Sequence, residues 1–152
     1  AEIGSIGGKE GAQEAAESIY ASVEECKIIV EQCNLDCLAP SLGTVHGKYK
    51  GEPKIDFERM QKISETTNVP LVLHGASGLY PEQIKQAISL GTAKINVNAD
   101  NHIAFTTAVR QLLNEDETIY SAFDYITVAK EAVKEKVMEK IKLFESDGKA
   151  SN

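Results

Sequence analysis

The sequence lacks any apolar run that approaches the roughly 20 residues needed to span a bilayer. No segment has the pattern of a secretory signal peptide either. Basic residues are in short supply, because 16 Lys and Arg stand against 23 Asp and Glu, for a net charge of −7. A surface this acidic repels the phosphates of nucleic acids and of anionic membranes. We therefore expect a protein that binds neither nucleic acid nor a membrane.

Cysteine is scarce as well, with only Cys26, Cys33 and Cys37 present. An odd number of thiols without a secretory signal is typical of the reducing cytosol, which predicts a cytoplasmic location. A metal site at this cluster would need further ligands nearby, and the local sequence supplies none. We expect these cysteines to be buried thiols.

The composition is that of a folded protein, with 42% hydrophobic and 26% charged residues over 152 positions. That length amounts to one domain or to part of a larger one. The chain begins at Ala1 rather than Met, which predicts that a segment upstream has been removed.

Short apolar runs of strand length alternate with helical patterns along the chain. A Gly-rich segment, 4–20, comes first and is predicted to be a mobile loop. Strands are expected at 37–42, 69–73 and 93–97, and helices at 23–33, 57–63, 81–91, 100–113 and 127–144. This alternation predicts an α/β fold with βαβ units and a parallel sheet.

Three polar residues stand where apolar runs end. His46 and His74 are 28 residues apart, and Asn96 follows His74 by 22. Parallel α/β proteins bind ligands at the carboxyl ends of their strands, so these residues should share one rim. Imidazole suits zinc, and Glu2 on the preceding strand end could be a third ligand. The alternative of hydrogen-bonded rim histidines without a metal stays open.

Glycines beside the two histidines indicate an anion site. Gly47, Gly75 and Gly78 let the backbone approach a ligand closely, and Ser77 adds a hydroxyl. Backbone N–H groups in such turns bind phosphates. Glycine used only for tight turns explains the pattern equally well.

The chain is short for a complete barrel. A (β/α)₈ barrel usually needs about 250 residues, whereas only three whole strands and a stub around Glu2 are evident. The pattern predicts the second half of such a barrel, with open strand edges that require a partner.

Three motifs, 43–47, 74–78 and 94–98, closely resemble those of the class II, zinc-dependent fructose-bisphosphate aldolases. The resemblance covers essentially the whole chain. It implies a single partial domain, 1–152, that forms the C-terminal half of a TIM barrel (strands 5 to 8 with their helices), in which 4–20 is the mobile active-site loop. These aldehyde-lyases reversibly cleave fructose 1,6-bisphosphate to dihydroxyacetone phosphate and glyceraldehyde 3-phosphate in glycolysis and gluconeogenesis.

The resemblance also implies site residues. His46 and His74 match zinc-binding histidines, and Glu2 matches a carboxylate that binds the metal in some states. Glu10 matches the loop glutamate that acts as base on dihydroxyacetone phosphate. Substrate-binding positions are matched by Gly47, Gly75, Ser77, Asn96 and Asn98. The implied cofactors are Zn²⁺ and a monovalent cation near the phosphate site.

Some family features are missing from this chain. The family's remaining zinc histidine, and the acid beside it, lie on an earlier strand, so we expect the isolated chain to be inactive without the N-terminal half-barrel. We also expect a homo-oligomer. Phe123 stands where many relatives carry an arginine for the far phosphate, which leaves the aldehyde-side specificity open. A tagatose-bisphosphate aldolase and a non-catalytic half-barrel scaffold are the alternatives.

Overall fold

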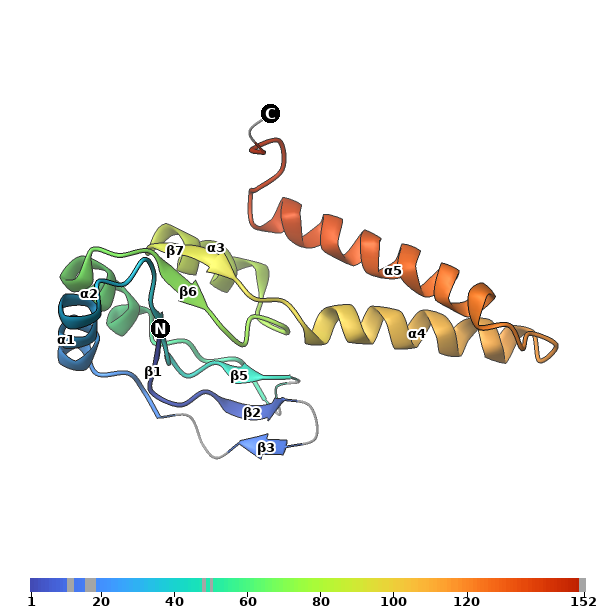
Figure 1. Ribbon diagram of the computed structural model, residues 1–152, viewed down its shortest axis with the longest axis horizontal. Coiled ribbons are helices and arrows are strands. Elements are labelled where there is room, and N and C mark those ends of the chain that lie inside the picture. Colours follow the sequence, from blue (N-terminus) through green and yellow to red (C-terminus); the bar gives the residue numbers. More distant parts are fainter. Residues whose placement is uncertain (11–12, 16–18, 48, 50, 151–152) are drawn as a thin grey trace. The chain divides into compact units, whose positions relative to one another are not determined.

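The computed structural model describes residues 1–10, 13–15, 19–47, 49 and 51–150 (Figure 1). These residues form two compact units, Ala1–Val97 and Asn98–Asn152. Within the described ranges, no helix is both long enough and apolar enough to cross a membrane.

Parallel strand pairs form the centre of the first unit. They are β1 (Glu2–Ile3) with β4 (Ala39–Pro40), and β6 (Leu71–Leu73) with β7 (Thr92–Ile95). The two pairs are joined by a parallel bridge between Leu38 and Leu71, in which the Val72 N–H donates to the Leu38 carbonyl at 2.8 Å. The spatial order β1, β4, β6, β7 therefore follows the chain order, and the prediction of an α/β fold with parallel strands is confirmed.

The Gly-rich segment contributes two further strands. β2 (Gly7–Glu10) runs antiparallel to β3 (Gln13–Ala15) and parallel to β5 (Val45–His46). Residues 11–12 and 16–18 lie outside the described residues. The expected mobility of 4–20 stays a prediction.

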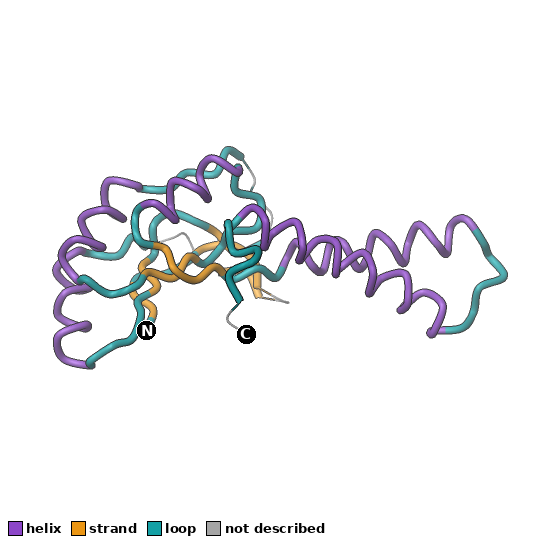
Figure 2. Tube along the Cα trace, turned by 90° about the horizontal axis from the view of Figure 1, so that it is seen from above, coloured by secondary structure: helices purple, strands orange, loops and turns teal. Residues whose placement is uncertain are grey.

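Helices α1 (Val23–Cys33), α2 (Phe57–Thr67) and α3 (Pro81–Ser89) lie beside these strands (Figure 2). Local chemistry fixes where two of them begin. The Ser22 hydroxyl accepts from the Glu25 N–H at 3.5 Å, and the Asp56 carboxylate accepts from the Arg59 N–H at 2.9 Å. Pro81 is the first residue of α3, as predicted.

The core of the first unit is made by the apolar faces of strands and helices. Its largest fully buried apolar side chains are Leu38, Leu42, Met60, Ile63, Leu71, Leu73 and Ile84. Met60 and Ile63 form the buried face of α2 that packs into this core.

The expectation of three buried thiols is wrong in part. Cys26 is buried, but Cys33 is exposed and Cys37 is intermediate. Cys33 is the last residue of α1, and Asn34 ends that helix in the left-handed conformation. The residues around it, 31–34, are all exposed, so this last turn is not covered by the core.

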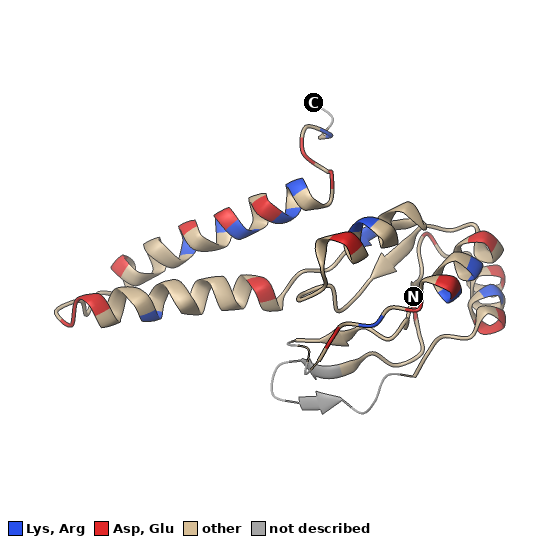
Figure 3. Ribbon diagram, turned by 180° about the vertical axis from the view of Figure 1, so that it is seen from behind, with Lys and Arg blue, Asp and Glu red and all other residues tan. Residues whose placement is uncertain are grey.

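The second unit is a pair of helices, α4 (Ala99–Glu115) and α5 (Ala122–Leu143). α5 begins five residues before the predicted 127. Its first apolar side chains are exposed, Phe123 to 78% and Ile126 to 49%, so they do not belong to the buried stripe from which the helix was predicted. Acidic and basic residues follow one another along α5, as the red and blue parts of the ribbon show (Figure 3). Lys140 on this helix pairs with Asp100 on α4 at 2.6 Å.

Candidate functional site

The two rim histidines lie next to each other. Their ring centroids are 6.0 Å apart, with 51° between the ring planes. His46 ends β5, where it pairs in register with Gly8, and His74 follows β6. His74 also faces the start of the chain, because its Nδ1 lies 3.4 Å from a carboxylate oxygen of Glu2. The structure therefore brings together all three predicted metal ligands, as neighbours around His74.

Asn96 joins this rim through its backbone. Its N–H donates to the Leu73 carbonyl at 3.2 Å, directly before His74. Its side-chain oxygen accepts from Lys94 Nζ at 2.5 Å. Because Lys94 and Asn96 are two residues apart on an extended segment, they share a face, and the Lys94 ammonium lies on the same rim.

The glycines beside the histidines have conformations that demand glycine. Gly47 and Gly75 have φ angles of +87° and +66°. A Cβ on Gly75 would lie 2.6 Å from the Val45 carbonyl oxygen, so the turn after His74 touches the backbone just before His46. Ser77, in the same turn, is 7% exposed. Tight packing thus accounts for Gly75 without a ligand, while the N–H groups of the turn remain compatible with anion binding.

Tyr49 was not identified from the sequence. Its hydroxyl accepts from the Val45 N–H at 3.2 Å and donates to the Gly75 carbonyl at 2.8 Å. Burial raises the pKa of this phenol, although the Val45 N–H acts in the opposite direction. The sequence carries no local signal for these contacts, because they depend on how the chain turns after position 46.

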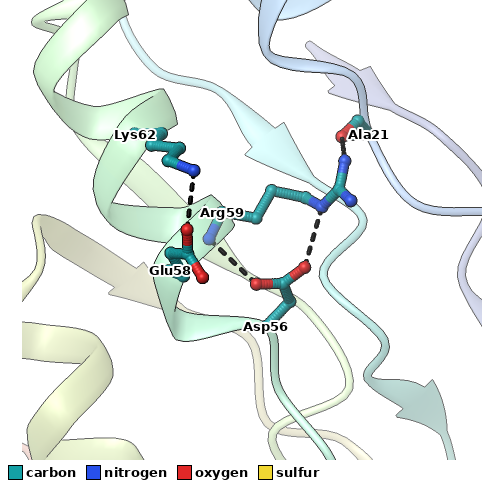
Figure 4. A network of polar contacts seen from close by, with 5 residues as sticks. All are labelled: Ala21, Asp56, Glu58, Arg59 and Lys62. Carbon is teal, nitrogen blue, oxygen red and sulfur yellow. Dashed lines mark hydrogen bonds and ion pairs between the residues drawn. The ribbon is translucent and has the colours of Figure 1, made fainter.

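A polar network holds the start of α1 to the start of α2 (Figure 4). Arg59 Nη1 donates to the Ala21 carbonyl at 2.8 Å, and Arg59 Nε donates to the Asp56 carboxylate at 3.0 Å. The Arg59 N–H, and then the side chain and charge of Arg59, hold the pKa of Asp56 below its ordinary value. Ala21 directly follows the segment 4–20, so this network fixes the point where that segment re-enters the core.

For two predicted site residues, Glu10 and Asn98, none of these contacts leads to the histidines. Glu10 is the last residue of β2 and pairs in register with Gln13, but its side chain lies outside the described residues. Asn98 precedes α4 as its N-cap residue and belongs to the second unit.

The donor types at the rim suit zinc, since imidazole nitrogen and carboxylate oxygen are both ordinary ligands of that ion. Among the described residues, however, no group of three or more His, Cys, Asp or Glu side chains is arranged to hold a metal ion. His46, His74 and Glu2 therefore fit zinc in chemistry and form an incomplete ligand set as they stand.

This chain is an α/β protein in which two histidines, each at or directly after the end of a strand, lie next to each other. Residues 1–149 match the family described as fructose-bisphosphate aldolase class-II. The chain belongs to this family, which confirms the resemblance drawn from its motifs.

Relatives with curated names agree. A fructose-bisphosphate aldolase of Geobacillus stearothermophilus is 50% identical over 151 residues, which make up 99% of this chain and 53% of that protein. One of Staphylococcus aureus (strain Mu50) is 49% identical over 150 residues, 99% of this chain and 52% of the relative. The chain thus spans about half the length of the curated relatives that it matches.

Solved structures share the fold. The YdjI aldolase of Escherichia coli K12 superposes with a TM-score of 0.77 at 41% identity, over 88% of this chain and 48% of that one. A putative fructose-1,6-bisphosphate aldolase of Coccidioides immitis gives 0.82 at 30% identity, over 97% of this chain and 52% of the other.

Proposed function

We propose that this chain is the C-terminal half of a (β/α)₈ barrel, strands 5 to 8 with their helices, from a class II fructose-bisphosphate aldolase. Within a complete barrel it would catalyse the reversible cleavage of fructose 1,6-bisphosphate to dihydroxyacetone phosphate and glyceraldehyde 3-phosphate. The observation that carries this proposal is the adjacency of His46 and His74, 6.0 Å apart, with Glu2 beside His74. The order of the parallel strands and the identity to named aldolases support it.

In this proposal His46 and His74 bind zinc, and Glu2 either orients His74 or joins the ligands. A bound zinc ion supplies Lewis-acid chemistry that polarises a ketone carbonyl. A monovalent cation is proposed near the phosphate site.

The other residues bind and orient the substrate. The N–H groups of Gly47 and Gly75 and the Ser77 hydroxyl hold a phosphate, which fixes the ketose in one register. Asn96 orients the substrate next to the metal site, and Asn98 contributes to the phosphate end.

Glu10 moves the proton. Its carboxylate removes a proton from the carbon next to the carbonyl of dihydroxyacetone phosphate in the direction of synthesis, and the carboxylic acid returns it after cleavage. Placement on the segment 4–20 lets this group approach as the segment covers the site and excludes water.

The test is a fusion that restores the barrel. The part of the Geobacillus stearothermophilus relative that this chain does not match is placed before Ala1, and cleavage of fructose 1,6-bisphosphate is measured with added zinc. We expect turnover by the fused protein and none by the chain alone. A fused protein that folds and binds zinc without cleaving the sugar would refute the activity.

Two comparisons refine the test. Glu10→Gln in the fused protein should lower kcat by at least about 100-fold, in the range of a lost general base, whereas Glu14→Gln on β3 should leave it nearly unchanged. Cleavage of tagatose 1,6-bisphosphate at a higher rate than its fructose isomer would favour the tagatose alternative. Absence of both zinc binding and phosphate binding would favour a scaffold.

The assembly of the complete protein is part of the proposal. We propose that the partner of this chain is the N-terminal half-barrel, and that the assembled barrel forms a homo-oligomer in the cytoplasm. Light scattering of the fused protein gives the number of subunits directly.

A further inference from the structure

One side chain connects the two strand ends that carry the histidines. The Tyr49 hydroxyl accepts a hydrogen bond from the Val45 N–H at 3.2 Å and donates one to the Gly75 carbonyl at 2.8 Å. Val45 is the residue before His46, and Gly75 is the residue after His74. A hydroxyl has one hydrogen to donate and two lone pairs to accept, so both bonds can exist together.

The ring of Tyr49 is held as well as its hydroxyl. A Cβ on Gly78 would lie 3.2 Å from Tyr49 Cδ2, so the ring lies against the bare backbone of the turn that follows His74. Gly78 has a φ of +88°, which glycine adopts without strain. The turn is therefore shaped to receive this ring, and the ring direction fixes where the hydroxyl points.

The two strand ends also touch directly. A Cβ on Gly75 would lie 2.6 Å from the Val45 carbonyl oxygen and 3.0 Å from the Val45 nitrogen. The absence of a side chain at Gly75 permits this approach, but close packing alone does not fix the position of one strand end along the other. The two hydrogen bonds of the Tyr49 hydroxyl fix this position, because each bond constrains the donor and acceptor directions.

We propose that Tyr49 is a positioning residue that ties the backbone before His46 to the backbone after His74 and thereby sets the separation and tilt of the two imidazoles. This inference rests on the proposed function, because the spacing of the rings matters to chemistry only if both bind the same metal. Residues of this kind act through the ligands that they orient.

Tyr49→Phe is the direct test, because it removes the hydroxyl and keeps the ring over Gly78. Tyr120→Phe is the matched control, since Tyr120 is 94% exposed in the second unit. The chain has three histidines, so the ring signals of His46 and His74 can be compared with that of His102 on α4 in one spectrum.

In the metal-free 152-residue chain, we expect Tyr49→Phe to shift the ring signals of both His46 and His74 and to leave His102 in place. Exchange of the Val45 amide proton should become faster, since its acceptor is lost. Unmoved His46 and His74 signals in a folded variant would overturn the proposal, and so would a change of the same size at His102.

Metal affinity gives the second readout, measured in the fused protein by competition between Co²⁺ or Zn²⁺ and a coloured chelator. We expect Tyr49→Phe to weaken binding by about tenfold, the lower end of the range for outer-shell partners of metal ligands, and Tyr120→Phe to leave it unchanged. Equal affinity of Tyr49→Phe and the parent would overturn the proposal. If the parent binds no metal, the proposed function fails instead, and the ring signals still decide the role of Tyr49.

Discussion

The guanidinium carbon of Arg59 lies 5.4 Å from the centre of the Tyr20 ring. Arg59 also donates a hydrogen bond to the carbonyl of Ala21, the residue that follows Tyr20. Arg59 thus holds two consecutive residues where the segment 4–20 re-enters the core. One residue before Tyr20, the backbone of Ile19 exchanges hydrogen bonds of 2.9 and 2.8 Å with the backbone of Ser5, near the start of the segment. The two ends of the segment that carries Glu10 are therefore fixed next to each other.

Arg59→Met should destabilise the chain by about 1 kcal/mol, because it removes a charged hydrogen bond in a partly exposed position. It should also speed amide exchange at Ile19 and Ala21 without affecting Val72 in the core. Lys62→Met is the control, since the Lys62–Glu58 pair on the same helix is exposed and should contribute little. Urea unfolding and hydrogen exchange measure both effects, and equal exchange at Ile19 in parent and variant would contradict the role given to Arg59.

The pH dependence of stability should contain a contribution from Asp56. Its pKa lies below the ordinary value of 3.8, chiefly because the Arg59 N–H donates to the carboxylate and then because of the Arg59 side chain and charge. A lowered folded-state pKa gives stability that is fully present above pH 3.8 and is lost as the pH falls through the folded-state value. Asp56→Asn should therefore flatten the acid limb of unfolding free energy against pH. An acid limb as steep as that of the parent would show that other carboxylates produce it.

Local chemistry made much of the fold predictable. Ser22, Asp56 and Pro81 mark helix starts by side-chain or ring properties that need no distant partner. The helices predicted from 23, 57 and 81 begin at those residues. The strands β2 and β3 were missed, because β2 begins with two glycines and neither strand shows an apolar alternation. They form by pairing, β2 with β5 and β3 with β2.

The site divides in the same way. His46 and His74 could be placed together from their spacing, because parallel strands put their carboxyl ends on one rim. Tyr49 could not, since its contacts with Val45 and Gly75 depend on how the chain turns after position 46. The exposure of Cys33 was missed because the helical stripe gives the inward face of α1 but does not say how far the last turn is covered.

Cys33 should react before Cys26 with a thiol reagent at pH 8. Burial raises the pKa of Cys26 to about 11, with Glu25 adding to the rise, so only about one Cys26 in a thousand is thiolate at that pH. Cys33 is exposed and should be labelled first. Because Glu31 lies between these two cysteines, cleavage after glutamate separates them for mass spectrometry. Labelling in urea should make all three alike, and fast labelling of Cys26 in the folded chain would contradict its burial.

Gly75→Ala should be strongly destabilising, whereas Gly51→Ala should not. At Gly75 the new Cβ meets the Val45 carbonyl oxygen at 2.6 Å, and φ is +66°, so the variant combines a backbone clash with an unfavourable conformation. Strain of this kind costs on the order of 1–3 kcal/mol before the clash is relieved, and we expect a loss of about 3 kcal/mol in urea unfolding.

Gly51 is the matched control, because a Cβ there meets nothing within 4 Å, and its substitution should change stability by less than about 0.5 kcal/mol. In Gly75→Ala the new methyl group pushes the Val45 backbone away from residue 75, and His46, the next residue, moves with it. The His46 ring signal should therefore shift together with that of His74, the same result that we expect from Tyr49→Phe. A Gly75→Ala variant as stable as Gly51→Ala would mean that the two strand ends are not in contact, and Tyr49 would then have nothing to hold together.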